Sequence, residues 1–334
     1  MVKTRKEGLE KYSRSRADFT EMPDDYVKGK IQYIMDRPLL FDGGTSESKA
    51  WETMKQNNPQ YAFFDDENLG EPASWLVPKH INSNTNNPQI SAAACISASS
   101  DDAYLDEWVD YHHALGFDHF YIYDSESLFT LEKWGTWKGG HVTIRLNNNI
   151  PVFHNQQEAW EDCIKQGIDR HSHLAILDTA DFVVLQNDHE LLQELLQQEK
   201  NQCISMKTYL FRTGGKALYE PLPVTKRFNM RQSQMLPDDD EENSGLIVSK
   251  ELLRNNPQLV TKADGLCETA TDSAVVYRYT RSTKECELKN PGAARCRLEG
   301  EMQDDTMWAQ VKRYLPKYAN YDGLYQDGPT SNST

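Results

Sequence analysis

From residue 90 onward, short apolar segments alternate with amphipathic ones, and this alternation restricts the fold more than any other feature of the sequence. The strand-like segments are ISAAACIS (90–97), HFYIYD (119–124), HVTIRL (141–146), HLAILD (173–178) and CISMKTYLF (203–211). The helix-like segments are 103–115, 156–168, 189–200 and 304–315. Strands that alternate with helices about every 25 residues predict an α/β fold, with a mostly parallel sheet and helices on both faces.

The first 90 residues have a different character. They are polar and irregular, and the segment HINSNTNNPQ (80–89) is rich in Asn, which is typical of a linker. We therefore predict an N-terminal extension and linker over residues 1–90, a main domain over 91–320 and a C-terminal tail over 321–334.

Charge and hydropathy exclude several classes of partner. The chain has 36 basic and 51 acidic residues, which gives a net charge of −15. Because phosphate contacts need clustered Lys and Arg, this balance disfavours nucleic acid as the main partner. No apolar run of about 18 residues occurs, and the N-terminus is charged, so we expect no transmembrane segment and no secretory signal. As written, the sequence predicts a soluble or cytoplasmic chain.

The cysteines and the missing motifs narrow the chemistry further. No CxxC pair, GxGxxG, P-loop or GxSxG motif occurs, and no His follows His189. Chemistry in the second half must therefore use other side chains. We expect the six cysteines to be mostly free, buried thiols, and a Cys286–Cys296 loop stays open.

Acidic residues follow three of the predicted strands. They lie in SSDD (99–102), at Asp124 and in LDTADF (177–182). In open α/β sheets, ligands bind outside the carboxyl ends of the strands. Carboxylates there suit a nucleotide-sugar, because one can accept hydrogen bonds from the base or ribose and another can hold Mg²⁺ or Mn²⁺ on the diphosphate. The alternative is that these strands simply end in polar residues.

Four segments carry a resemblance to a known family. CISASSDDAYLDEWVDYHHALGFDHFYIYDSES (95–127) resembles the opening of the family-92 glycosyltransferases, and LDTADFVVL (177–185) resembles their DxDEF strand end. YLFRTGGKALYEPLPVTKRF (209–228) and TDSAVVYRYTRSTKE (271–285) are similar to later elements of that family. The resemblance implies a GT-A fold and metal-assisted transfer of a hexose, with galactose favoured, from a UDP-sugar to a glycan or glycoconjugate. It also implies the Golgi or the secretory pathway.

Some departures from the family pattern fall on the metal ligands. In the DxDEF segment, the first Asp is Asp178, Ala180 replaces the second Asp, and Asp181 replaces the Glu. The resemblance leaves Asp178 and Asp181 as ligands of Mn²⁺ or Mg²⁺, in a site that Ala180 weakens. In an extended strand, positions 178 and 181 point to opposite faces, so a turn is needed to bring them together.

Other departures change the charge of the donor site. Asp101 follows two serines where the family has K/R-N-E, Tyr277 or Arg278 stands at its His, and Arg281 replaces its Lys. An Arg on the diphosphate can supply the charge that a metal ion would supply. The resemblance thus predicts donor binding by Asp101, Asp124, Asp178, Arg278 and Arg281.

Three outcomes remain open: a rebuilt metal site, an enzyme that works without metal, or a protein that does not catalyse. Transfer needs a base beside the acceptor hydroxyl, and the acidic residues considered for it are Glu220, Asp264, Glu268 and Asp272. Of these, Asp272 and Glu268 are the predicted catalytic residues. The leading prediction is glycosyl transfer. The alternative is a catalytically inactive relative that binds sugar nucleotide or glycan, or acts as a partner subunit.

Overall fold

The computed structural model describes ten parts of the chain: residues 90–98, 102–124, 141–146, 156–186, 191–198, 203–212, 223–234, 245–256, 267–280 and 301–322. Several sequence-based predictions fall outside these ranges. They are the N-terminal extension and linker up to residue 89, Asp101, Arg281, the Cys286–Cys296 loop and the tail beyond residue 322.

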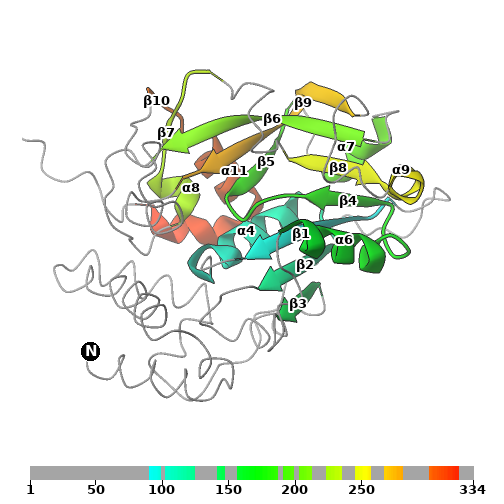
Figure 1. Cartoon of the computed structure of the whole chain (residues 1–334). Coiled ribbons are helices and arrows are strands. Elements are labelled where there is room, and N and C mark those ends of the chain that lie inside the picture. The colour runs from blue at the N-terminus through cyan, green and yellow to red at the C-terminus, as the bar shows by residue number, and fades with distance from the viewer. Residues whose placement is uncertain are drawn as a thin grey trace, which may run out of the picture.

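The described residues form a sheet flanked by helices (Figure 1). The strands are β1 (Ala92–Ala98), β2 (His119–Asp124), β3 (Val142–Leu146), β4 (His173–Ile176), β5 (Asp181–Leu185), β6 (Cys203–Arg212), β7 (Met230–Arg231), β8 (Leu246–Ser249), β9 (Glu268–Tyr279) and β10 (Met302–Gln303). The helices are α4 (Asp102–Leu115), α6 (Gln156–Gly167), α7 (Leu192–Gln198), α8 (Val224–Arg227), α9 (Lys250–Asn255), α11 (Thr306–Tyr314) and the 3₁₀ helix η5 (Pro316–Tyr321).

The sheet has a parallel half and a mixed half. Strands β3, β2, β1 and β4 lie in this order and are parallel to one another. Strand β8 joins β4 to β6 through antiparallel pairings, and β9 pairs parallel to β6 and antiparallel to β5. Strands β6 and β9 therefore run in the direction of β1. Strands β1, β2, β3, β4, β6 and β9 end at one edge, which we call the carboxyl edge, whereas β5 and β8 run in the opposite direction. The predicted α/β fold class is confirmed.

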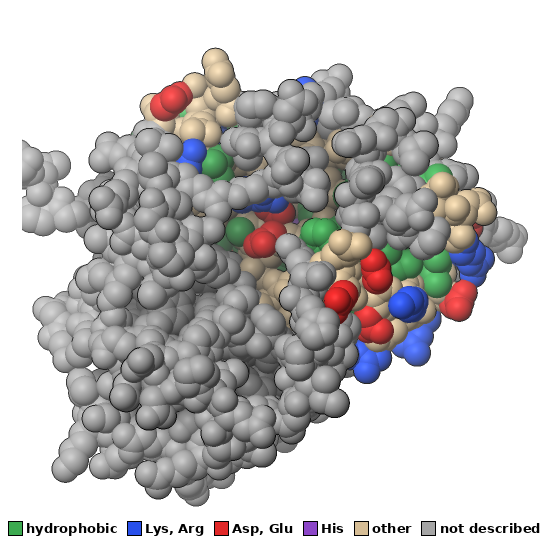
Figure 2. All heavy atoms as spheres, viewed as in Figure 1, with side chains coloured by type: hydrophobic (Ala, Val, Ile, Leu, Met, Phe, Trp, Pro, Cys, Tyr) green, Lys and Arg blue, Asp and Glu red, His purple; other side chains and the backbone are tan. Residues whose placement is uncertain are grey.

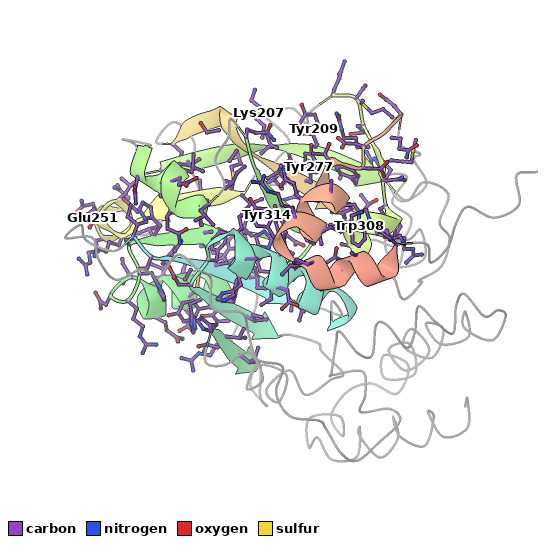
Figure 3. The ribbon with its side chains drawn as sticks, turned by 180° about the vertical axis from the view of Figure 1, so that it is seen from behind. Lys207, Tyr209, Glu251, Tyr277, Trp308 and Tyr314 are labelled. Atoms are coloured by element: carbon purple, nitrogen blue, oxygen red, sulfur yellow. A yellow bond between two sulfur atoms is a disulfide. The ribbon has the colours of Figure 1, made fainter. Side chains whose placement is uncertain are left out.

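Helices cover both faces of the sheet, as predicted. Alternate residues of β1 belong to two separate cores, because side chains alternate across a strand. Ala94 and Ile96 pack with Trp108 of α4, whereas Ala93 and Cys95 pack with residues of α6. Helix α11 lies on the α4 side, where the Tyr314 ring meets the Tyr111 ring edge-on, with 5.8 Å between the ring centroids. Trp308 and Tyr314 of α11 are visible from behind in Figure 3.

The expectation of free thiols is wrong for four cysteines. Cys95 of β1 is bonded to Cys163 of α6, and Cys203 of β6 is bonded to Cys267, just before β9. The pairs are 68 and 64 residues apart in sequence, and only the fold brings their Cα atoms to 5.9 and 4.7 Å. In the chain-entropy account, loops of this length give each bond about 4 kcal/mol of stability.

Gly116 ends helix α4 at the position expected for a C′ glycine. Its φ angle is 121°, a conformation that L side chains rarely adopt, and its N–H donates to the carbonyl oxygens of His112 and His113. None of the helices in the described part of the chain combines the length and the apolar character that a membrane crossing requires.

Candidate functional site

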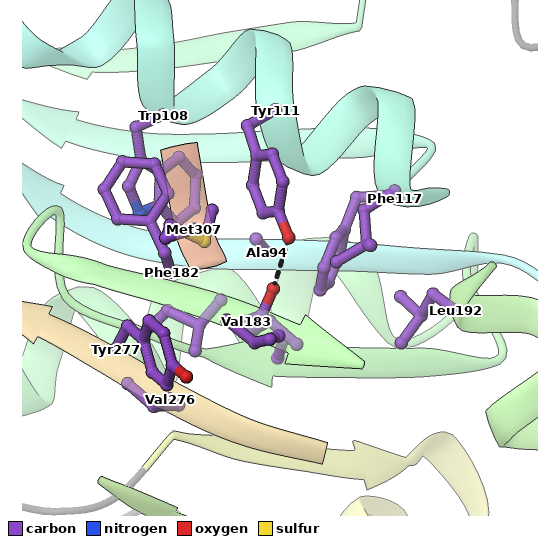
Figure 4. Packing of buried hydrophobic residues seen from close by; sticks show 14 of the residues in the cluster. Ala94, Trp108, Tyr111, Phe117, Phe182, Val183, Leu192, Val276, Tyr277 and Met307 are labelled. Atoms are coloured by element: carbon purple, nitrogen blue, oxygen red, sulfur yellow. Dashed lines mark hydrogen bonds between the residues drawn. The ribbon is translucent and has the colours of Figure 1, made fainter. Parts of the chain in front are cut away.

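Helix α4 closes the open edge of strand β5 with side-chain hydrogen bonds. Among the described strands, β5 pairs only with β9, so its other backbone edge needs partners from elsewhere. Trp108 Nε1 donates to the carbonyl oxygen of Asp181 at 2.6 Å, and the Tyr111 hydroxyl donates to the carbonyl oxygen of Val183 at 2.8 Å. The second of these bonds is drawn in Figure 4. The Val183 N–H donates to His112 Nε2 at 3.2 Å.

These contacts fix the protonation of His112. Its Nε2 accepts from Val183, so Nδ1 carries the proton and donates to the Trp108 carbonyl oxygen at 2.8 Å. Burial lowers the pKa of His112 to about 3, so the ring is neutral at physiological pH. Both ring nitrogens already have protein partners. Trp108, Tyr111 and His112 therefore hold β5 in place and do not face a substrate.

Glu107 of the same helix holds α8. Its carboxylate accepts from the backbone N–H groups of Val224 at 2.5 Å and Thr225 at 3.3 Å, and from the Thr225 hydroxyl. Burial raises the pKa of Glu107 to about 7, although the hydrogen bonds from Thr225 and Val224 oppose this shift. Helix α4 thus anchors two segments, α8 and β5, next to the carboxyl edge.

A tight turn joins β4 to β5 at that edge. The Asp181 N–H donates to the carbonyl oxygen of Asp178 at 3.0 Å, and the Ala180 N–H donates to Asp178 Oδ1 at 2.8 Å. In return, the Asp178 N–H donates to Asp181 Oδ2 at 3.1 Å. The predicted fourth strand over 173–178 therefore ends early, at Ile176, and a second strand begins at Asp181. The turn that is needed to bring positions 178 and 181 together is therefore present.

The same turn places Asp181 against Arg278. The two residues face each other in the antiparallel β5–β9 pair. Arg278 Nε donates to Asp181 Oδ1 at 2.6 Å, and Nη2 donates to Oδ2 at 2.9 Å. The Asp181 side chain is 1% exposed and that of Arg278 is 14% exposed. Burial raises the pKa of Asp181 above its usual value, and the positive charge of Arg278 opposes this shift. Arg278 also has contacts beyond Asp181.

Arg212 lies on the same face of the sheet and was missed by sequence reasoning. Leu210 of β6 pairs with Arg278 of β9, and Arg212 follows Leu210 by two positions, so Arg212 and Arg278 point to one side of the two strands. Arg212 is buried and has contacts with other residues. A basic residue that directly follows a predicted strand, in YLFRTGG, is the signal that could have identified it. In Figure 2, acidic and basic side chains lie together in a hollow over the β4–β5 turn.

The structure separates the remaining candidates. Asp124 ends β2 opposite Ala98 at the carboxyl edge. Glu268 pairs with Ile204 and Arg278 with Leu210, six positions apart on β6, which corresponds to about 20 Å. Asp272 lies beyond Ala274 on β9, so it is more than about 13 Å along the strand from Arg278. The catalytic roles of Asp272 and Glu268 stay predictions.

The residues at the turn do not fit the predicted metal site. Asp178 is half-buried, Ala180 has no ligand atom, and both oxygens of Asp181 accept from Arg278. The positive guanidinium would also repel a cation held by Asp181. Within the described ranges, no three His, Cys, Asp or Glu residues are grouped so that they could hold a metal ion.

Comparison with known proteins supports the resemblance. Residues 92–250 match the sequence profile of Glycosyltransferase family 92. This match confirms the resemblance over the stretch from β1 to the start of α9, and it supports glycosyl transfer as the general activity. No curated protein matches the sequence significantly.

Several solved structures are similar to this chain. HddC from Yersinia pseudotuberculosis is 10% identical, with 62% of this chain and 98% of that chain covered and a TM-score of 0.36. A glucosyl-3-phosphoglycerate synthase from Mycobacterium tuberculosis, solved with Mn²⁺, UDP and glucosyl-3-phosphoglycerate, is 14% identical, with 69% and 79% covered and a TM-score of 0.34. Residues 1–349 of TarS from S. aureus are 13% identical, with 70% and 73% covered and a TM-score of 0.36.

Proposed function

We propose that this protein transfers a hexose, with galactose favoured, from a UDP-sugar to a hydroxyl group of a glycan or glycoconjugate. The observation that carries the proposal is the family match over residues 92–250, within which the DxDEF-like segment forms the turn at the carboxyl edge of the sheet. Ligands of open α/β sheets bind at this edge. Hexose transfer from UDP-galactose is the chemistry that the sequence resemblance implies.

The edge offers groups for each part of such a donor. Asp178 and Asp124 are carboxylates suited to the hydroxyls of the ribose or the sugar, because an ionised carboxylate only accepts hydrogen bonds. Arg278 suits the diphosphate, because a guanidinium binds phosphate oxygens in a fork. The resemblance adds Arg281, which lies outside the described residues. Asp272 and Glu268 stay the candidates for the base that the acceptor hydroxyl needs, and both lie on the part of β9 away from Arg278.

One observation favours a second candidate function. Ala180 removes one ligand, and Asp181, one of the two ligands still expected, is bonded to Arg278. Only Asp178 is left, so the chemistry that a metal supplies is weakened. A catalytically inactive relative that binds a sugar nucleotide or a glycan would keep the fold and the donor site without turnover. The two functions differ in one result: both bind UDP, and only the enzyme forms a glycosylated product.

Product formation tests the proposal. The full chain is incubated with UDP-galactose, UDP-glucose or UDP-N-acetylglucosamine and a set of glycan acceptors, and mass spectrometry detects the added sugar. We expect the mass of one hexose to be added, and Asp178→Asn to reduce the rate. Asp169→Asn is the matched control, because Asp169 is 77% exposed and pairs with Arg254 of α9 at the opposite edge. UDP binding without any product would leave only the inactive relative.

Two disulfides bear on the compartment. We propose that the protein folds in the secretory pathway, because bonds such as Cys95–Cys163 and Cys203–Cys267 form and persist in oxidising compartments and are rare in the cytosol. This differs from the cytoplasmic location that the sequence, taken as written, suggested. Mass spectrometry of the protein from cells, alkylated without reduction, tests it: both bonded pairs are expected, and free thiols at these four positions would contradict it.

A further inference from the structure

We propose that Arg278, together with Arg212, binds the donor diphosphate without a divalent cation, and that Asp181 positions Arg278 instead of binding metal. The inference rests on the proposed function and names how that site recognises its donor. The observation that carries it is the buried Asp181–Arg278 pair at the turn where the family's metal ligands would stand.

Both carboxylate oxygens of Asp181 are bonded to Arg278. Its Oδ1 accepts from Nε, and its Oδ2 accepts from Nη2 and from the Asp178 N–H. A metal ion would have to replace Arg278 at a carboxylate that is 1% exposed. Removal of one partner from a buried ion pair leaves the other charge without compensation, which is costly. The pair is therefore the stable state of these two side chains.

Asp178 alone is a weak basis for a metal site. Its Oδ1 already accepts from the Ala180 N–H at 2.8 Å. Mg²⁺ can bind through a single carboxylate and substrate phosphates, but Asp178 belongs to the same turn as Asp181, which holds the Arg278 guanidinium. The repulsion between a divalent cation and this guanidinium works against metal binding, whereas a phosphate gains from the guanidinium.

The geometry orients Arg278 for an anion. The Arg278 guanidinium is a planar fork of N–H groups, and its bond pair to Asp181 sets the direction of that fork. Because Asp181 is held by the Asp178 N–H and by Trp108 at its carbonyl oxygen, the plane of the guanidinium is fixed by the turn and by α4. Such pre-organisation lowers the entropic cost of binding.

Arg212 balances the charge. Asp178 and Asp181 contribute two negative charges, and Arg278 and Arg212, on one face of β6 and β9, contribute two positive charges. Without Arg212, the group would carry a net negative charge and would repel a diphosphate. With both arginines, the four side chains carry no net charge, and the fork of Arg278 is held by its two bonds to Asp181.

Calorimetric titration of UDP into the full chain tests the inference. The titration is run after dialysis against EDTA and again with 1 to 5 equivalents of Mn²⁺, on the wild type and on Arg278→Gln, Arg278→Lys and Arg254→Gln. We expect the same affinity in both buffers, and binding about 10- to 100-fold weaker in Arg278→Gln, as for a lost charged hydrogen bond. Arg278→Lys should recover only part of the loss, because an ammonium is not a fork. Arg254→Gln should bind as the wild type.

A double-mutant cycle separates positioning from simple stability. Asp181→Asn should weaken UDP binding in the wild-type background and have almost no effect in the Arg278→Gln background, because it acts through Arg278. A merely structural role would give the same effect in both backgrounds. The double variant Asp181→Asn with Arg278→Gln lacks both charges of the ion pair, so neither is left without its partner, and circular dichroism checks that each variant is folded.

The outcomes are distinct. Binding that requires Mn²⁺ overturns the metal-free site while the UDP-sugar function stands. Equal effects of Asp181→Asn in both backgrounds overturn its positioning role. No binding of UDP in either buffer overturns the proposed function, and this inference with it.

Discussion

The contact between α4 and the edge of β5 can be tested by removing one oxygen atom. Tyr111→Phe deletes the hydroxyl that donates to the Val183 carbonyl oxygen at 2.8 Å and lies 3.2 Å from Gln310 Oε1. Tyr111 is fully buried, so water cannot replace the lost donor. A buried acceptor left without a partner costs about 1–3 kcal/mol, and Phe keeps the packing of the ring.

The effect can be read as a change in melting temperature. For a folded region of about 150–250 residues, 1 kcal/mol shifts the Tm by about 2–4 °C, so Tyr111→Phe should lower the Tm by about 2–12 °C. Urea denaturation should give a lower midpoint with an unchanged slope. The assay needs only purified wild type and variant at one pH and under non-reducing conditions.

The same substitution at Tyr123 is the matched control. The Tyr123 hydroxyl donates to Asp162 Oδ2 at 2.8 Å, but Asp162 is half-buried and also accepts from Gln166. Because this acceptor keeps another donor, Tyr123→Phe should cost less than about 1 kcal/mol. Equal Tm shifts for the two variants would refute the reasoning that α4 closes the edge of β5.

Three further predictions follow from the buried groups. Reduction with dithiothreitol should lower the Tm strongly, since two loops of 68 and 64 residues lose their cross-links, and an unchanged Tm after verified reduction would contradict the pairing. Burial lowers the pKa of His119 to about 4, so the unfolded chain binds a proton first and stability should fall as the pH drops from about 6.5 to 4; His119→Gln should flatten this slope in urea titrations, and an unchanged slope would count against it. Burial raises the pKa of Glu107 to about 7, so the folded protein holds this proton more tightly than the unfolded chain and its stability should fall as the pH rises from about 4.5 to 7. Glu107→Gln should remove this part of the pH dependence in urea denaturation curves, and an unchanged pH dependence would contradict the prediction.

Local patterns predicted the parallel half of the fold well. The segments 119–124 and 103–115 match β2 and α4 closely, because apolar periodicity and the glycine at position 116 are local signals. Strands β8 and β9 were not predicted, because their apolar residues follow polar stretches and their partners are set by antiparallel pairing in space.

The sequence identified residues of the candidate site but not the contacts between them. The sequence pointed to Asp178, Asp181 and Arg278, but Asp181 was read as a metal ligand. Its actual partner, Arg278, is 97 residues away and reaches it only through the β5–β9 register. The disulfides were missed for the same reason, since no spacing rule links Cys95 to Cys163. Long-range pairing of this kind leaves no signal in a single sequence.

A crystal structure of the full chain with UDP-galactose and MnCl₂ would test the central claim most directly. The account predicts the diphosphate at the carboxyl edge, with its oxygens within hydrogen-bond distance of Arg278, and with Asp181 still paired to Arg278 and no manganese between them. Manganese density bridging the diphosphate to Asp178 or Asp181, with Arg278 turned away, would contradict it.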